Sequence, residues 1–228
     1  MCGRYFLTTP GELLADLFEA PATSEAVAAA LVPRYNIAPT QAVPIVRAKP
    51  DGTRELASAH WGLVPHWAKE RAIGNKLINA RAETVAEKPS FRDAFRRRRC
   101  LIPADGYYEW KKDGPTKQPF VFRRKDRATI AFAGIWSTWK DPGTGEPLES
   151  CAILTTTPDA LAATVHDRMP VILPAARFSP WLDSATPSPS LRELFSPAPA
   201  DEMEAYAVSR QVNRPSNDSP ALLEPIPT

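Results

Sequence analysis

The sequence predicts an α+β fold, a single domain in which a mostly antiparallel sheet is accompanied by short peripheral helices. Short strand-like runs fill the middle of the chain and are separated by turns rich in Asp, Gly and Pro. Helical segments do not alternate regularly with these runs, as a parallel sheet would require. No repeat, low-complexity linker or boundary divides residues 1–228, so we expect one domain with a Pro-rich tail from about residue 213.

The first helix is predicted to follow Thr9. Thr9 is its expected cap, Pro10 suits the first helical position, and Glu12 completes a capping box. Four apolar side chains then recur at helical spacing and are expected to face the core: Leu13, Leu14, Leu17 and Phe18. An Ala-rich segment, residues 22–31, is expected to be a weak helix or a loop.

Short strands dominate the chain from Val43 onward. The expected strands are residues 43–48, 55–63, 100–104, 106–112, 119–124, 128–136, 151–157 and 204–212. Residues 112–119 read "KDGPTKQP", which is typical of a hairpin connection. Three helical pieces interrupt the strands: residues 82–88, residues 89–99 with Ser90 as the cap, and residues 158–165.

Composition and charge restrict the class of protein. The chain is 43% hydrophobic and 24% charged, as in an ordinary soluble globular protein. No apolar run approaches the ~20 residues of a membrane helix, and no signal peptide is recognisable, so we expect a cytoplasmic protein. Residues 1–127 hold 22 Lys and Arg against 14 Asp and Glu, whereas residues 128–228 hold 6 against 12. This asymmetry suggests a polyanionic partner for the first half.

The cysteines and histidines do not indicate a metal or a cofactor. The three cysteines lack C-x-x-C spacing, which argues against a zinc ribbon and a redox pair. Cys100 and Cys151 lie in strand-like runs and are expected to be buried hydrophobes. His60 and His66 lack metal-ligand spacing, and "PGTGE" at residues 142–146 is expected to be a turn rather than a phosphate loop.

Four short motifs combine reactive groups: "MCGRY", "NARAET", "DGYYEW" and "HDRMPVIL". Cys2 supplies a nucleophile, Glu109 among aromatic residues and His166 can transfer protons, and Asn79 offers a neutral hydrogen-bonding side chain. Taken singly, Glu109 could be a solvent-facing carboxylate and His166 a structural residue. Arginines adjoin the motifs, namely Arg4, Arg81 and Arg168. Since arginine suits bidentate phosphate contacts, the set predicts a nucleophilic centre ringed by phosphate-binding groups.

Aromatic residues and a basic run are further candidates for a nucleic-acid surface. "WGLVPHWAK" holds Trp61, which we expect in the core, and Trp67, which we expect to be exposed and able to stack on an unpaired base. "YNIAPTQ" presents Pro39 in a loop. The run at residues 96–99 is equally consistent with a solvated helix end and with attraction of a phosphate backbone.

Seven motifs, occurring in the family's order, together resemble the SOS-response-associated peptidase (SRAP) family: "MCGRY", "YNIAPTQ", "WGLVPHWAK", "NARAET", "FRRRRCLIPADGYYEW", "HDRMPVIL" and "VSRQVNRPSND". The resemblance implies an α+β domain with a barrel-like β core. It also implies a protein that binds single-stranded DNA and captures abasic sites in a covalent crosslink, with peptidase activity confined to self-removal of Met1. The implied crosslinking residue is Cys2.

The resemblance also assigns roles to the other residues. Asn79, Glu109 and His166 fall on active-site positions, Arg4 and Arg81 on phosphate-contacting positions, and Pro39 and Trp67 on positions that wedge against the flanking bases. We expect Glu109 to shuttle protons at the α-amine, His166 to assist opening of the sugar ring, and Asn79 to orient the amine or the opened sugar. Arg168 is expected to join the phosphate ligands.

The chemistry explains why the cysteine should stand at the terminus. An abasic deoxyribose opens to an aldehyde, which the neutral α-amine can attack to form an imine. The β-thiol then closes a five-membered thiazolidine, which only an N-terminal cysteine allows. Two alternatives stay open: a cysteine peptidase or amidohydrolase with an N-terminal nucleophile, and a non-catalytic reader of modified cytosine in DNA. A strand-nicking lyase side activity is also left open, and a monomer is the default expectation.

Overall fold

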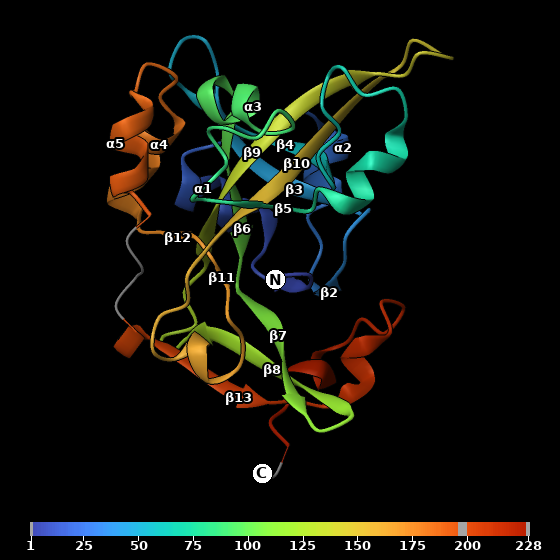
Figure 1. Cartoon of the computed structure of the whole chain (residues 1–228), viewed down its shortest axis with the longest axis vertical. Helices are drawn as coiled ribbons and strands as arrows, with labels where there is room; N and C mark the ends of the chain where they lie inside the picture. Colours follow the sequence, from blue (N-terminus) through green and yellow to red (C-terminus); the bar gives the residue numbers. More distant parts are fainter. Residues whose placement is uncertain (1, 196–199, 227–228) are drawn as a thin grey trace.

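Two β-sheets form the framework of the computed structural model, which describes residues 2–195 and 200–226 (Figure 1). The first sheet has the strand order β13-β8-β7-β1-β2. Its strands are β1 (Tyr5–Leu7), β2 (Arg34–Ile37), β7 (Gly106–Asp113), β8 (Thr116–Arg124) and β13 (Met203–Ala207). All pairings within this sheet are antiparallel.

The second sheet closes on itself into a barrel. Its order is β11-β10-β4-β3-β6-β9-β12, and β10 pairs with β9 as well as with β4, so β4, β3, β6, β9 and β10 form a ring. The strands are β3 (Ala42–Ala48), β4 (Arg54–Trp61), β5 (Asn79–Arg81), β6 (Arg99–Ala104), β9 (Ile130–Lys140), β10 (Pro147–Thr156), β11 (Met169–Pro170) and β12 (Ile172–Leu173). Only the pairings of β10 with β4 and with β5 are parallel. The barrel-like, mostly antiparallel α+β fold predicted from the sequence is therefore confirmed.

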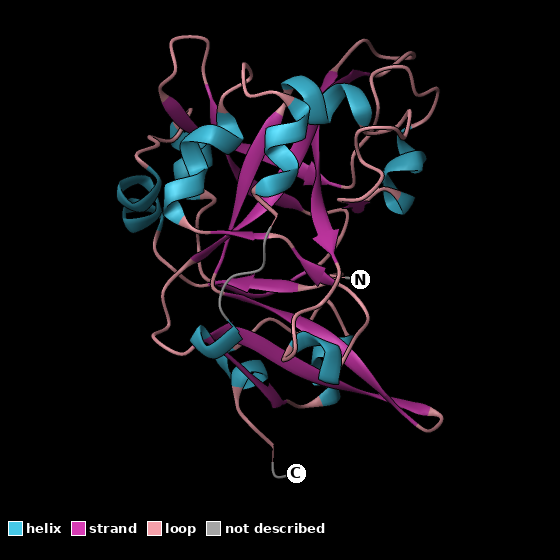
Figure 2. Ribbon diagram, turned by 60° about the vertical axis from the view of Figure 1, so that its left-hand side comes forward, coloured by secondary structure: helices cyan, strands magenta, loops and turns pink. Residues whose placement is uncertain are grey.

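Short α-helices lie around the barrel, and helical turns near the C-terminus lie beside the first sheet (Figures 1 and 2). The α-helices are α1 (Gly11–Phe18), α2 (Glu25–Ala29), α3 (Arg92–Arg97), α4 (Phe178–Leu182) and α5 (Ser188–Glu193). The 3₁₀ turns are η1 (Arg71–Lys76), η2 (Ala162–Thr164), η3 (Ala175–Arg177), η4 (Ala200–Glu202), η5 (Arg210–Asn213) and η6 (Pro220–Leu223). No helix in the described ranges is long and apolar enough to cross a membrane.

Apolar side chains of the two sheets meet in one main core, and its aromatic members join the sheets. Tyr5 of β1 makes edge contacts with Trp61 of β4 and Phe132 of β9, and Tyr107 of β7 stacks on Phe122 of β8 with ring centroids 4.9 Å apart. Cys100, Cys151 and Trp61 are fully buried, as the sequence predicts.

Gly106 allows the close approach of β1 to β7. A Cβ atom at this position would lie 2.4 Å from the carbonyl oxygen of Phe122 and 2.5 Å from the ring of Phe6. Those distances exclude any larger residue without movement of the backbone. The absence of a side chain at Gly106 therefore permits the close packing of β1 against β7.

Several local expectations were wrong. Thr9 does not cap α1, because its hydroxyl donates to Asp105 Oδ1 at 2.7 Å and Pro10 stands at the cap position. Leu14 and Phe18 are buried, but Leu13 and Leu17 are 48% and 51% exposed because only one narrow face of α1 meets the barrel.

Two of the expected helical pieces form no α-helix. Residues 82–88 are turns, and residues 158–165 contain only the 3₁₀ turn η2. The third piece begins later than expected, since α3 starts at Arg92 after Phe91 rather than being capped by Ser90. Tertiary contacts outweigh the weak helical preference of these short segments.

The Pro-rich segment after residue 213 packs onto the domain. Leu222 is fully buried, and the side-chain amide of Asn36 in β2 donates to the carbonyl oxygens of Arg214 and Asn217, at 3.0 and 2.7 Å. Residues 213–226 are thus an integral part of the fold that borders the site described below.

Candidate functional site

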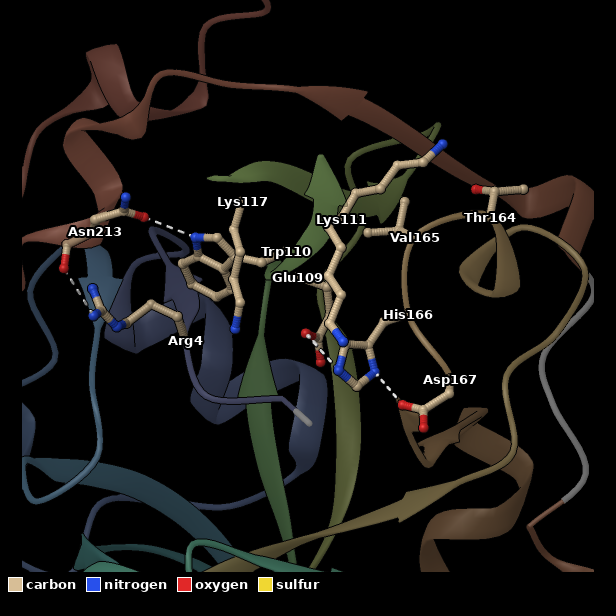
Figure 3. Close-up of a pocket in the computed structure, with 11 residues that line it drawn as sticks. Arg4, Glu109, Trp110, Lys111, Lys117, Thr164, Val165, His166, Asp167 and Asn213 are labelled. Atoms are coloured by element: carbon tan, nitrogen blue, oxygen red, sulfur yellow. Dashed lines mark hydrogen bonds and ion pairs between the residues drawn. The ribbon is translucent and has the colours of Figure 1, made fainter. Parts of the chain in front are cut away.

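A groove of about 980 Å³ runs along one edge of β7 (Figure 3). β7 pairs with β8 along its length, but on its other side it pairs with β1 only at Gly106 and Tyr107. The amide of Tyr108 still donates to the carbonyl oxygen of Arg4, at 2.9 Å. Within the described chain, no strand covers this edge from Glu109 onward, and the residues before Tyr5 lie beside it.

Cys2 is fully buried beside this groove, and Asn79 holds its main chain. The amide nitrogen Nδ2 of Asn79 donates to the carbonyl oxygen of Cys2 at 2.8 Å. Asn79 begins β5, a three-residue strand that is held in place by its parallel pairing with β10. Burial raises the pKa of the Cys2 thiol far above its usual value, and the charge of Glu109 raises it further. The thiol is therefore protonated at neutral pH.

Glu109 lies on β7 with only 3% of its surface exposed. Burial raises the pKa of this carboxyl, while the nearby His166 acts in the opposite direction. Glu109 Oε2 lies 4.0 Å from His166 Nε2, and Figure 3 shows the two side chains turned toward each other across the groove. A buried carboxyl next to an imidazole can store and exchange a proton.

The other ring nitrogen of His166 has two neighbours. Nδ1 lies 3.1 Å from the amide nitrogen of Arg168 and 2.9 Å from Asp167 Oδ1. A neutral ring accepts the amide hydrogen and keeps its own proton on Nε2, toward Glu109. A protonated ring can donate from Nδ1 to the Asp167 carboxylate. The surroundings of His166 thus accommodate both charge states that proton transfer requires.

Arg168 is held by an ion pair rather than projecting freely into the groove. Its two terminal nitrogens donate to Glu83 Oε1 and Oε2 at 2.7 and 2.9 Å, and one of them also donates to the carbonyl oxygen of Thr155 at 2.7 Å. These bonds lower the pKa of Glu83. A phosphate could use Arg168 only in competition with Glu83, so its assignment as a phosphate ligand stays a prediction.

Arg4 and Arg81 differ in how they are held. Arg4 lines the groove and donates to Asn36 Oδ1 and to the carbonyl oxygen of Val212, each at 2.7 Å. Partial burial lowers the pKa of Arg4, and its charge has no carboxylate partner among the described residues. Arg81 is exposed at the end of β5, on the same face of that strand as Asn79.

Pro39 and Trp67 lie outside the groove on two neighbouring loops. Thr40 has a φ of 73°, and its amide donates to the carbonyl oxygen of Trp61 at 2.8 Å, which fixes the half-buried Pro39 beside the end of β4. Trp67 is 50% exposed on the loop that follows the same strand. As expected, Trp61 belongs to the core and Trp67 does not.

The basic run at residues 96–99 divides into two kinds of residue. Arg96 and Arg97 are exposed, but Arg99 is buried and donates to four main-chain carbonyl oxygens: those of Phe95, Arg96, Trp181 and Asp183. Arg99 therefore joins the ends of α3 and α4, and the expectation of a uniformly solvated or DNA-facing run was wrong.

Four buried polar atoms in and around this region have no hydrogen-bond partner among the described residues: Tyr5 OH, Asn79 Oδ1, Thr155 Oγ1 and Arg168 Nε. Such orphaned groups are uncommon in folded proteins and are often satisfied by a ligand or by water. No cluster of three or more His, Cys, Asp or Glu side chains in the described ranges could hold a metal ion.

Several residues of the groove stand outside the motifs that predicted the site. Lys111, Lys112 and Lys117 line it together with Trp110 and Asn213. The lysines follow Glu109 in the predicted hairpin, so the strand pattern could have placed them near the site. Asn213 could not have been found in this way, because it reaches the groove only through the packing of the C-terminal segment.

Comparison with known proteins shows similarity over the whole fold. The family model of SOS response associated peptidase (SRAP) matches residues 1–215. The abasic site processing protein YoaM of Bacillus subtilis is 42% identical over 226 residues, covering 98% of both chains. The abasic site processing protein YoqW of the same organism is 46% identical over 194 residues, covering 84% of this chain and 86% of that protein.

A crystal structure of a protein from Bacteroides thetaiotaomicron has the same fold. It superimposes with a TM-score of 0.90 at 27% identity, covering 99% of this chain and all of the other. The sequence and structural similarities therefore span both sheets and the groove beside β7.

Proposed function

Because the chain belongs to the SOS response associated peptidase family, we propose that it senses abasic sites in single-stranded DNA and captures them covalently through Cys2. The crosslink would shield the lesion during the DNA damage response. One observation carries the proposal: Asn79 fixes the main chain of Cys2 next to the facing pair Glu109 and His166, at a groove bordered by cationic side chains.

The reaction needs Cys2 as the first residue. Hydrolysis of the peptide bond between Met1 and Cys2, which we propose the protein carries out on itself, adds one water and frees the α-amine. The amine attacks the aldehyde carbon of the opened sugar, and loss of one water gives an imine. The sulfur then adds to the imine carbon, the thiol proton passes to the nitrogen, and a thiazolidine results.

The electrostatics of the site support this order of steps. The thiol of Cys2 has a raised pKa and is a poor first nucleophile, whereas an α-amine with a reference pKa of ~8 is partly neutral at pH 7. Glu109 is placed to take the proton that the amine releases. It would return this proton to the hydroxyl group that leaves as water when the imine forms, and the regenerated carboxylate would then pass the thiol proton to the nitrogen during ring closure. His166 can donate a proton to the ring oxygen of the sugar as the ring opens.

The remaining residues would position the DNA. Asn79 Oδ1, which has no partner among the described residues, is available for the α-amine or the opened sugar. Arg4, Arg81 and, in competition with Glu83, Arg168 would hold phosphates around the lesion. The half-buried Pro39 and the exposed Trp67, on neighbouring loops, would wedge against the flanking bases.

The two alternatives fit the site less well. A cysteine hydrolase normally activates its nucleophile by lowering the thiol pKa, and here burial raises the pKa of Cys2. A reader of modified cytosine would leave unexplained why Cys2, Glu109 and His166 converge.

The test mixes protein with single-stranded DNA that carries one abasic site. Removal of Met1 is first verified by mass spectrometry. We expect a shifted species on a denaturing gel, with the summed mass of protein and DNA less one water. Cys2→Ala should abolish the crosslink, and a protein that retains Met1 should form none. Absence of a covalent product from Met1-free protein would refute the proposal, whereas amide turnover without a crosslink would favour a hydrolase.

A further inference from the structure

The open edge of β7 continues from the reacting residues to the tip of the β7–β8 hairpin. Glu109 and Lys111 point to one side of β7, and Trp110 and Lys112 point to the other. All four line the groove. Among the described residues, no strand pairs with this edge of β7 beyond Tyr107. Figure 3 shows Lys111 on the groove that holds Glu109 and His166.

Lys112 stands directly opposite Lys117 of β8 in the register of the hairpin. Opposed side chains on neighbouring antiparallel strands have Cβ atoms about 4.5–5.5 Å apart, and like charges in this position are unfavourable. Among the side chains that the structure describes, no carboxylate forms an ion pair with Lys111, Lys112 or Lys117. Three lysine side chains therefore lie together on the groove, toward the tip of the β7–β8 hairpin.

We propose that Lys111, Lys112 and Lys117, here named the lysine edge, bind the phosphates of the DNA strand on one side of the abasic site. This inference rests on the proposed function and extends it, since it adds a subsite beyond the arginines around the lesion. From Glu109 to Lys112 the strand rises about 10 Å. The lysine edge therefore lies within the reach of phosphates beyond the captured sugar.

Trp110 and Asn213 form one side of the groove next to the lysine edge. The indole nitrogen of Trp110 donates to Asn213 Oδ1 at 2.8 Å, and Arg4 also donates toward the carbonyl oxygen of Asn213 at 3.4 Å. Asn213 of the C-terminal segment thereby connects Trp110 of the hairpin with Arg4 near the N-terminus. A strand leaving the sugar would pass along a positive channel that three distant parts of the chain build together.

The test measures binding without chemistry. The probe is fluorescently labelled single-stranded DNA that carries a tetrahydrofuran abasic analogue, which has no aldehyde. Affinity is measured by anisotropy at several KCl concentrations. The triple variant Lys111→Gln, Lys112→Gln, Lys117→Gln is compared with a control that removes the same charge outside the groove: Lys49→Gln, Lys125→Gln, Lys140→Gln.

Removal of one lysine–phosphate interaction should reduce the slope of log affinity against log salt by about 0.7, so the slope of the lysine-edge variant should fall by up to about 2 units. The control should keep the native slope. The reduction should appear with DNA extended on one side of the analogue and should be smaller with DNA extended only on the other side. An equal slope in the variant and the native protein, for both extensions, would overturn the inference.

Lysines on an open strand edge can instead prevent edge-to-edge association. In that case the variant would self-associate in light scattering while its salt slope stayed native, and this result would also overturn the inference. Native protein is tested in parallel with aldehyde-containing DNA. If it crosslinks while the slopes are equal, only the lysine edge fails; if it never crosslinks, the proposed function itself fails.

Discussion

Loss of the Asn79 side chain should slow crosslinking without preventing folding. In Asn79→Ala, the carbonyl oxygen of Cys2 loses the donor that lies 2.8 Å away in the native protein. An unsatisfied buried acceptor costs about 1–3 kcal/mol. If this cost appears in the positioning of the reacting amine, the rate falls roughly 5- to 150-fold. Water cannot easily replace the donor, because Cys2 is fully buried.

The assay follows a single turnover, with Met1-free protein in excess over abasic DNA and samples taken at intervals onto denaturing gels. Binding to the tetrahydrofuran analogue is measured separately, and it should change far less than the rate. Asn75→Ala, which alters an exposed asparagine of η1, is the matched control and should react at the native rate. A native rate for Asn79→Ala, with Met1 removed, would refute the positioning role of this amide.

Three further changes test the electrostatics and the framework. Burial raises the pKa of Glu109, so the contribution of this carboxyl to stability is present at low pH and is lost as pH rises through the raised pKa. Glu109→Gln should therefore melt at a higher temperature than the native protein at pH 8 but not near pH 4, and it should crosslink far more slowly. An identical pH dependence of melting in the two proteins would contradict the raised pKa. Arg99→Met removes the donors to four carbonyl oxygens and should destabilise the protein by about 3–5 kcal/mol. Urea unfolding measures this loss, with Arg97→Met, at an exposed arginine, as the control. Equal unfolding midpoints for the two variants would contradict the role of Arg99. Glu83→Gln removes the bidentate partner of Arg168 and should tighten binding of the tetrahydrofuran DNA about 2- to 10-fold in low salt; weaker binding would show that Glu83 is needed to orient Arg168.

Most long strands could be predicted from the sequence, and some short elements could not. The runs around Val43, Leu101 and Ile153 carry enough apolar and β-branched residues to mark β3, β6 and β10. β1, β2 and β5 have three or four residues each and little pattern of their own, so their pairing depends on strands far away in the chain. Residues 82–88 do not form the expected helix, because a segment this short has too few helical turns to be stable without tertiary contacts.

In the candidate site, too, the sequence predicts the residues of short motifs but not the contacts between distant residues. Cys2, Asn79, Glu109 and His166 could be chosen from the sequence because reactive and orienting groups stand there in short, specific motifs. The ion pair of Arg168 with Glu83 could not be foreseen, since the two residues are 85 positions apart. Nor could the four carbonyl acceptors of Arg99, which come from the ends of two helices.

The sequence by itself determined the chemical groups of this protein, the family to which it belongs and the class of its fold, because these depend on residue identity and on local periodicity. Only the tertiary structure decided that the Cys2 thiol is buried and its pKa raised, that Arg168 is already paired with Glu83, and that one edge of β7 lies beside three lysines. Burial, pairing and exposed edges are set by contacts between distant segments, and no local pattern encodes them.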